Sequence, residues 1–137
     1  MRRLALALVL LVLVAGCGGS SPPTDKQQIT TTLEAYYKAF GSGDSAGACQ
    51  QLAEDTRAQL SKASGGKDCT AVLDAALKRP DYARIAAKLD GARVEQVNIV
   101  RNTATARILV PDLKASTPVA LEKEKGTWKI ASPITDG

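Results

Sequence analysis

The apolar residues of this chain change their spacing near residue 92, and this change limits the folds that the chain can adopt. From residue 24 to residue 91, apolar side chains recur at intervals of three and four residues, as in helices that pack by one face. Between Thr103 and Val110 they stand at every second position, which is the pattern of a half-buried strand. Helices followed by strands predict an α+β domain, with the helices covering one face of an antiparallel sheet.

Capping signals divide the helical part into several segments. Thr24 and Gln27 are spaced as a capping box, and Gly41 can end the helix that they begin. The apolar stripe of this helix comprises Ile29, Leu33, Tyr36, Tyr37 and Phe40. Three aspartates stand where the N-caps of later helices are expected: Asp44, Asp55 and Asp68. We expect Pro80 to stop the helix that follows Asp68, and Asp81 to restart a short one.

The last helix and the strands complete the expected order of elements. The last helix should bury Tyr82, Ile85 and Leu89. A strand is expected from residue 93 to residue 100, although its alternation is imperfect. Turns are expected at Arg101-Asn102 and at Lys125-Gly126. The core face of the second strand comprises Ala104, Ala106, Ile108 and Val110.

The first 16 residues have the three-part layout of a secretory signal. Arg2 and Arg3 precede an apolar run from residue 4 to residue 14, which is shorter than the roughly 20 residues of a spanning helix. Residues 14–17 (Val-Ala-Gly-Cys) resemble the bacterial lipobox, whose cysteine carries acyl chains such as palmitate after cleavage. We therefore expect a signal peptide at 1–16, a lipidated Cys17 with a flexible tether at 17–23, and a protein anchored on the extracytoplasmic face of the cell membrane. The alternatives are an ordinary signal peptide with a free Cys17, or an uncleaved anchor.

The other two cysteines and the charge balance restrict the chemistry. An even pair of cysteines outside the cytoplasm predicts a disulfide between Cys49 and Cys69, with two buried free thiols as the alternative. A metal site is not expected, because the chain has no histidine and no Cys-x-x-Cys spacing. Without Arg2 and Arg3, 16 basic residues face 14 acidic ones in dispersed positions. Nucleic acid is therefore not an expected partner.

Two segments of the chain resemble the nuclear transport factor 2-like superfamily. Residues 36–44 (Tyr-Tyr-Lys-Ala-Phe-Gly-Ser-Gly-Asp) resemble the end of the first helix in that group, and residues 126–130 (Gly-Thr-Trp-Lys-Ile) resemble its last strand. The resemblance spans residues 24–133, within an expected domain at 24–135. It implies helices on a curved antiparallel sheet, forming a cone with an apolar pocket and needing no cofactor. The superfamily includes isomerases, dehydratases, cyclases and members whose pocket has no known chemistry, so the fold alone does not identify the activity.

Tyr36 and Leu60 are the residues on which the ketosteroid isomerase branch of that superfamily can be tested. Tyr36 matches the position of its oxyanion-hole tyrosine, but an ungapped count from Asp44 puts Leu60 at the position of its general base. A leucine cannot abstract a proton, so a structural role for Tyr36 is favoured over a catalytic one. For Trp128, packing against the sheet is favoured over stacking on a ligand. The candidate pocket residues are Ile29, Leu33, Tyr36, Phe40, Leu60 and Trp128.

Three functions follow from these expectations. The first is a non-catalytic module on a lipid anchor that binds a small apolar ligand or an envelope protein. The second is a cofactor-independent isomerase or lyase that uses Tyr36 and a carboxylate without an assigned position. The third is a purely structural envelope lipoprotein. The sequence leaves the ligand, the partner and the oligomeric state open.

Overall fold

The computed structural model describes residues 18–19 and 21–132, so the signal sequence, Cys17 and residues 133–135 lie outside the described residues. Within them, the helices are α1 (Asp25–Gly41), α2 (Ser45–Gln51), α3 (Glu54–Ala63), α4 (Cys69–Leu77) and α5 (Pro80–Ala86), followed by the 3-10 turn η1 (Leu89–Gly91). The strands are β1 (Arg93–Val100), β2 (Thr103–Val110), β3 (Ala115–Glu124) and β4 (Thr127–Ser132), with a second 3-10 turn, η2 (Pro111–Leu113), before β3. This order confirms the predicted α+β class.

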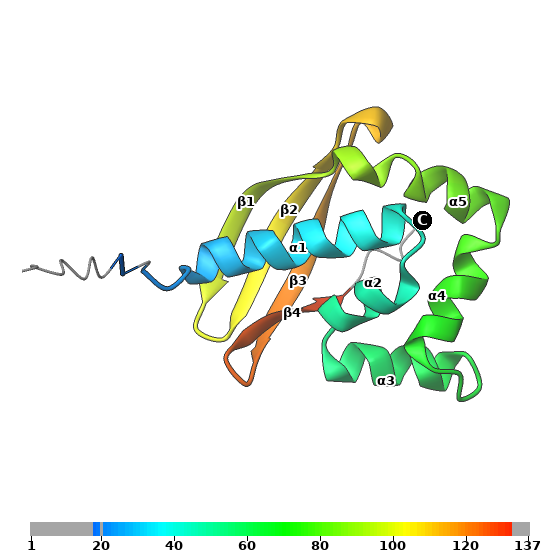
Figure 1. The fold of residues 1–137 in the computed structure, drawn as a ribbon, viewed down its shortest axis with the longest axis horizontal. Coiled ribbons are helices and arrows are strands. Elements are labelled where there is room, and N and C mark those ends of the chain that lie inside the picture. Colours follow the sequence, from blue (N-terminus) through cyan, green and yellow to red (C-terminus); the bar gives the residue numbers. More distant parts are fainter. Residues whose placement is uncertain (1–17, 20, 133–137) are drawn as a thin grey trace, which may run out of the picture.

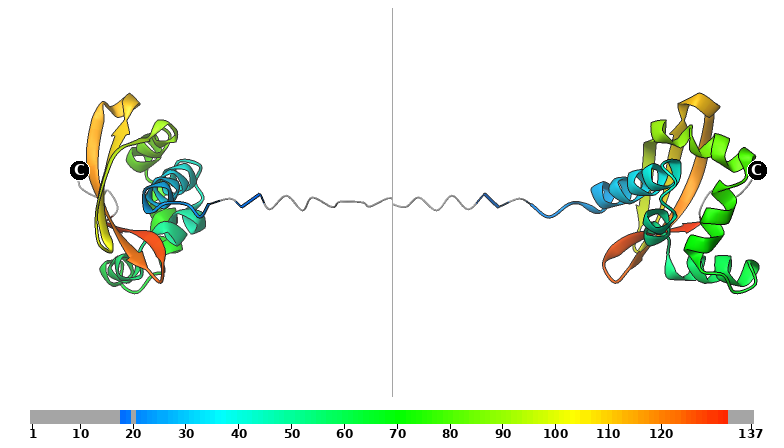
Figure 2. Two further views of the ribbon diagram at one scale, coloured as in Figure 1. Left: turned by 90° about the vertical axis from the view of Figure 1, so that its left-hand side faces the viewer. Right: turned by 45° about the vertical axis from the view of Figure 1, so that its right-hand side comes forward.

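The four strands form one antiparallel sheet in the order β1-β2-β3-β4, so each strand pairs with its neighbour in the chain. Helix α1 lies across one face of this sheet, while α3, α4 and α5 form an arc beyond its end (Figure 1). Figure 2 shows the sheet nearly edge-on, with α1 and α5 on the same side of it. The predicted core face of β2 is confirmed, because its four apolar residues are all buried: Ala104, Ala106, Ile108 and Val110.

The imperfect alternation of β1 has a local cause. The pairing register with β2 shifts between Val94 and Gln96, which leaves Glu95 as an extra residue. In a regular strand, Val97 and Ile99 would face away from Val94, because they lie an odd number of positions from it. The bulge reverses the alternation, so all three side chains pack against the core. Both expected hairpin turns are present at their predicted positions.

Helix α1 begins and ends as the sequence predicts. The Thr24 side chain accepts from the Gln27 amide at 3.2 Å, and the Gln27 side chain accepts from the Thr24 amide at 2.8 Å. All five residues of the predicted stripe are buried. The buried Thr32 hydroxyl donates to the Trp128 carbonyl at 3.2 Å, which fixes the helix against β4. Helix α1 thus provides the hydrophobic surface on which the sheet packs.

Two of the three predicted aspartate caps are confirmed and one is wrong. Asp44 accepts from the Gly47 amide, and Asp68 accepts from the Ala71 amide. Asp55 is not the N-cap, because α3 begins at Glu54, two residues earlier than expected, with Ala53 at the N-cap position. The missing acceptor comes from β3, where Glu124 Oε1 accepts from the Glu54 amide at 2.7 Å. A partner 70 residues away leaves no local sequence signal.

The predicted last helix is wrong in two respects. Helix α5 begins at Pro80 rather than at Asp81, since proline tolerates the first helical position. Ile85 was expected in the core but its side chain is 44% exposed. The helix ends at Ala86 and the chain tightens into η1, so the helical spacing from Ile85 to Leu89 does not hold. Leu89 is buried as predicted and Tyr82 is half-buried, while Ala86 is buried in place of Ile85.

The edge of the sheet at β4 is covered by the link between α2 and α3. Leu52 forms a parallel bridge with Ile130, and the Ala53 amide donates to the Ile130 carbonyl at 2.8 Å. The buried Thr56 hydroxyl donates to the Ala131 carbonyl at 2.7 Å. Helices and sheet are therefore joined by main-chain hydrogen bonds as well as by the core.

Candidate functional site

A hollow on the surface lies where α2, α3 and α4 meet. It is open, has a volume of about 860 Å³, and mixes polar with small apolar side chains. Its lining residues are Ala46, Cys49 and Gln50 on α2, Glu54, Arg57, Ala58 and Ser61 on α3, and Asp68, Cys69 and Thr70 at the start of α4. On α2 and α3 these residues are spaced by three and four positions, so each helix turns one face to the hollow.

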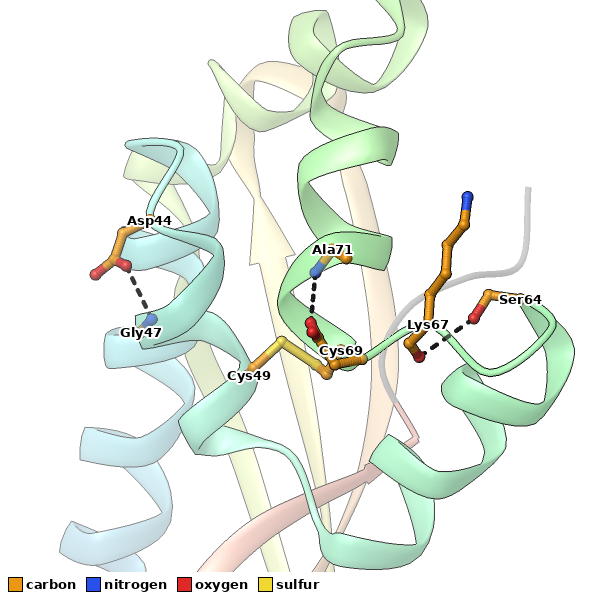
Figure 3. Close-up of a disulfide and its surroundings, with 8 residues drawn as sticks. Asp44, Gly47, Cys49, Ser64, Lys67, Cys69 and Ala71 are labelled. Atoms are coloured by element: carbon orange, nitrogen blue, oxygen red, sulfur yellow. Dashed lines mark hydrogen bonds between the residues drawn. A yellow bond between two sulfur atoms is a disulfide. The ribbon is translucent and has the colours of Figure 1, made fainter.

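The predicted disulfide is confirmed, and both of its cysteines line this hollow. Cys49 on α2 and Cys69 on α4 are bonded, with their Cα atoms 6.0 Å apart and both residues buried. Figure 3 shows the bond crossing directly between the two helices. Because the helices are covalently joined here, the hollow has a rigid base.

The rim of the hollow is polar and partly held by its own hydrogen bonds. Asp68 uses Oδ1 to accept from the Ala71 amide at 2.8 Å, so this carboxylate is committed to the start of α4. In the loop before Asp68, outside the lining, the Ser64 hydroxyl donates to the Lys67 carbonyl at 3.4 Å (Figure 3). Glu54 and Arg57 are exposed on α3. The site thus offers both charge signs and several hydrogen-bonding groups on a fixed base.

The six candidate pocket residues lie elsewhere, in the interior. Five of them belong to the hydrophobic core and are at most 8% exposed: Ile29, Leu33, Tyr36, Phe40 and Trp128. Leu60 is half-buried on α3 and packs against that core from its side. None of the six lines the hollow at the disulfide. A ligand cavity among these side chains stays a prediction.

Tyr36 has an apolar, aromatic environment. Its ring meets that of Tyr37 edge-on, with centroids 5.3 Å apart, and stacks on Phe40 at 6.0 Å. Burial alone raises the pKa of Tyr36 to about 12, so its hydroxyl is protonated at neutral pH. Burial likewise raises the pKa of Tyr37. The two carboxylates nearest to Leu60 in the sequence, Glu54 and Asp55, are exposed on the first turn of α3.

A polar cluster at the start of α1 was missed by sequence reasoning. Asp25 Oδ1 accepts from Lys123 Nζ at 2.7 Å and from Trp128 Nε1 at 3.0 Å. The hydrogen bond from Lys123, followed by the one from Trp128, lowers the pKa of Asp25. The partners are about a hundred residues apart in the sequence, so no local pattern could have found them. The cluster ties the point where the tether ends to the β3–β4 hairpin.

Acidic side chains from β3 gather at the start of α3. Burial, followed by the charges of Glu124 and Asp55, raises the pKa of Glu122. Glu124 is the residue that accepts from the Glu54 amide. Among residues 18–19 and 21–132, no three Asp, Glu, Cys or His side chains are arranged so that they could hold a metal ion. No helix in the same residues is long and apolar enough to cross a membrane.

Comparisons with known proteins add little on function. No family model matches the chain. A segment of 42 residues, 31% of the chain, is 43% identical to part of a D-alanine–D-alanine ligase from Methylobacterium sp. (strain 4-46), but it spans only 11% of that enzyme. Among solved structures, the chain is similar to an NTF-2-like protein of unknown function from Shewanella oneidensis MR-1. The TM-score is 0.46 at 17% identity, and the match covers 79% of this chain and 95% of that one.

Proposed function

We propose that this protein is a lipoprotein anchored to the extracytoplasmic face of a membrane through acyl chains on Cys17, and that its domain is a non-catalytic module that binds a protein partner. The observation that carries the proposal is the disulfide between Cys49 and Cys69. It supports the location, because such bonds form and persist outside the cytoplasm. It supports the binding site as well, because it makes the base of the hollow rigid.

The chemistry of the hollow favours a protein partner over a small apolar ligand. Gln50, Arg57 and Thr70 present hydrogen-bonding groups around an open surface, and small side chains leave room between them. An apolar ligand needs an enclosed, largely apolar pocket to lose its contact with water. A polar loop of another protein can instead satisfy these groups while the rigid base limits the entropy lost on binding.

The anchor is tested by the variant Cys17→Ser, which removes the acyl acceptor. We expect the protein to leave the membrane fraction, or to lose its acyl mass if the uncleaved signal sequence still retains it. Mass spectrometry of the wild-type protein should find acyl chains on Cys17. A wild-type protein without acyl mass on Cys17 would overturn this part of the proposal.

The binding site is tested by a photo-reactive amino acid at position 57, in the hollow, and as a matched control at position 114, an exposed lysine position after η2. Irradiation of intact cells should give a discrete cross-linked species from position 57 and none from position 114. Native mass spectrometry of the purified protein is the second measurement. If it finds a co-purified small molecule, and position 57 gives no cross-link, the hollow binds a small ligand and the proposed protein partner is wrong.

A further inference from the structure

We propose that the tips of the two hairpins, β1–β2 and β3–β4, lie on the anionic headgroups of the membrane that holds the anchor, and thereby orient the domain. This inference rests on the proposed lipid anchor and adds an interaction surface to it. We name this surface the hairpin tips and define it as Val100, Arg101 and Lys125. All three side chains are exposed, and Val100 is the most exposed large apolar residue of those that the structure describes, at 60%.

The hairpin tips lie beside the point where the tether joins the domain. Three interactions meet at Lys123 of β3. Its Nζ donates to Asp25 at the start of α1, and its amide donates to the Asn102 carbonyl in the β1–β2 turn at 2.9 Å. Lys123 also pairs with Trp128, which lies two residues beyond the β3–β4 turn. Figure 1 shows both turns on the side of the molecule from which the tether leaves, whereas η2 lies at the opposite end of the strands.

The length of the tether keeps this side close to the membrane. Six residues, 18–23, separate Cys17 from Thr24. Even fully extended, the seven steps from Cys17 to Thr24 span only about 25 Å, and the pair Pro22-Pro23 restricts the chain further. The domain therefore samples the lipid surface at high effective concentration, and a weak attraction is enough to hold one side against it.

Both basic residues of the hairpin tips lie in an unfavourable region of backbone conformation. Arg101 and Lys125 both have the left-handed backbone conformation, at φ 57° and 48°, and so does Lys114 after η2, at φ 50°. Glycine, asparagine or aspartate adopt this conformation more readily than a long side chain does. Because Lys114 shares this conformation, the backbone does not distinguish the hairpin tips, and what distinguishes Arg101 and Lys125 is their place beside the tether.

The charges around the hairpin tips leave the basic groups free to meet an anionic surface. Asp25 is paired with Lys123, and Glu124 accepts from the first amide of α3. Glu122 is half-buried on β3, where it pairs with Thr103 next to the β1–β2 turn, and the charges of Glu124 and Asp55 act on it. Arg101 and Lys125 project at the ends of the hairpins, where basic side chains are attracted by acidic lipid headgroups. The exposed Val100 can enter the boundary between headgroups and acyl chains.

The test uses the full lipidated protein in vesicles and Trp128, the single tryptophan of the chain, as a fluorescence donor. The vesicles contain a dansyl-labelled lipid as acceptor and consist either of phosphatidylcholine or of equal parts of phosphatidylcholine and phosphatidylglycerol. We expect energy transfer from Trp128 to rise on the vesicles with phosphatidylglycerol, and high salt to abolish this rise because it screens the attraction.

The double variant Arg101→Asn with Lys125→Asn removes the two tip charges and places residues suited to the turns, so misfolding would not explain a loss. We expect this variant to lose the rise in energy transfer. The matched control, Lys62→Asn with Lys67→Asn, removes two exposed charges on α3 and the loop after it and should keep the rise. Equal transfer on both kinds of vesicle, or an equal loss in both variants, would overturn the proposal.

Flotation of the same samples separates this inference from the proposed anchor. Protein that fails to float with either kind of vesicle shows that the anchor is wrong. Protein that floats with both kinds but shows no rise in energy transfer retains its anchor, and only the role of the hairpin tips is then refuted.

Discussion

At the scale of the residue, burial and pairing decide the behaviour of the notable side chains. Tyr36 has the sequence position of a hydrogen-bond donor to a substrate, yet it is packed among Tyr37 and Phe40. Asp25 has no distinction in the sequence, yet it accepts hydrogen bonds from Lys123 and Trp128. The contacts of a side chain, rather than its place in a motif, determine its chemistry.

The burial of Tyr36 predicts a loss of stability in alkaline solution. Its pKa rises from the ordinary value of 10.0 to about 12 in the folded protein. The unfolded chain therefore releases this proton first, so stabilisation by Tyr36 is complete below pH 10 and is lost as the pH rises toward 12. The free energy of unfolding should fall by about 2 kcal/mol more over this range in the wild type than in Tyr36→Phe. Urea unfolding at several pH values measures the free energy of unfolding, with Tyr82→Phe as the matched control. The prediction is refuted if this free energy falls equally with pH in the wild type and in Tyr36→Phe.

At the scale of the element, the helices differ in how their first turns are satisfied. Helices α1, α2 and α4 are capped by residues that immediately precede them: Thr24, Asp44 and Asp68. Helix α3 is preceded by Ala53, which has no side-chain acceptor, and receives its cap from Glu124 of β3. The first turns of α1, α2 and α4 are thus satisfied locally, whereas that of α3 is satisfied only where β3 packs beside it.

The cap on α3 predicts a specific effect of substitutions at Glu124. Glu124→Ala should lower the free energy of unfolding by about 1 kcal/mol, because the Glu54 amide loses its acceptor. Glu124→Gln keeps an acceptor oxygen and should cost less. Chemical denaturation measures both variants, and Glu95→Ala, at an exposed position of β1, serves as the control. Equal stability of Glu124→Ala and the wild type would mean that the cap contributes nothing.

At the scale of the whole molecule, long-range connections hold the helical half to the sheet and also hold two of the helices to each other. The core packs α1 on the sheet, the link between α2 and α3 pairs with β4, and the disulfide joins α2 to α4. Helix α4 lies at the rim of the molecule (Figure 1), and among its residues only Cys69 and Leu73 are buried. The disulfide therefore compensates for the limited core contact of this helix.

Removal of the disulfide should lower global stability. The bond closes a segment with a sequence separation of 20 residues. In the chain-entropy account, opening such a loop costs about 3 kcal/mol of unfolding free energy. Urea unfolding of the double variant Cys49→Ala with Cys69→Ala should show this loss, and reduction of the wild type should reproduce it. The prediction fails if the variant unfolds at the wild-type urea concentration, or if a reductant also destabilises the variant.

The sequence by itself determined those features that depend on neighbouring residues. Periodicity set the order of helices and strands, short-range acceptors set the caps at Thr24, Asp44 and Asp68, and an even pair of cysteines predicted the disulfide. Only the tertiary structure decided the cap from Glu124, the polar cluster at Asp25 and the exposure of Ile85. It also decided that α2, α3 and α4 meet around a hollow whose lining the sequence did not predict. The physical reason is that these features depend on which distant surfaces meet when the chain packs, and a linear pattern carries no information about such contacts.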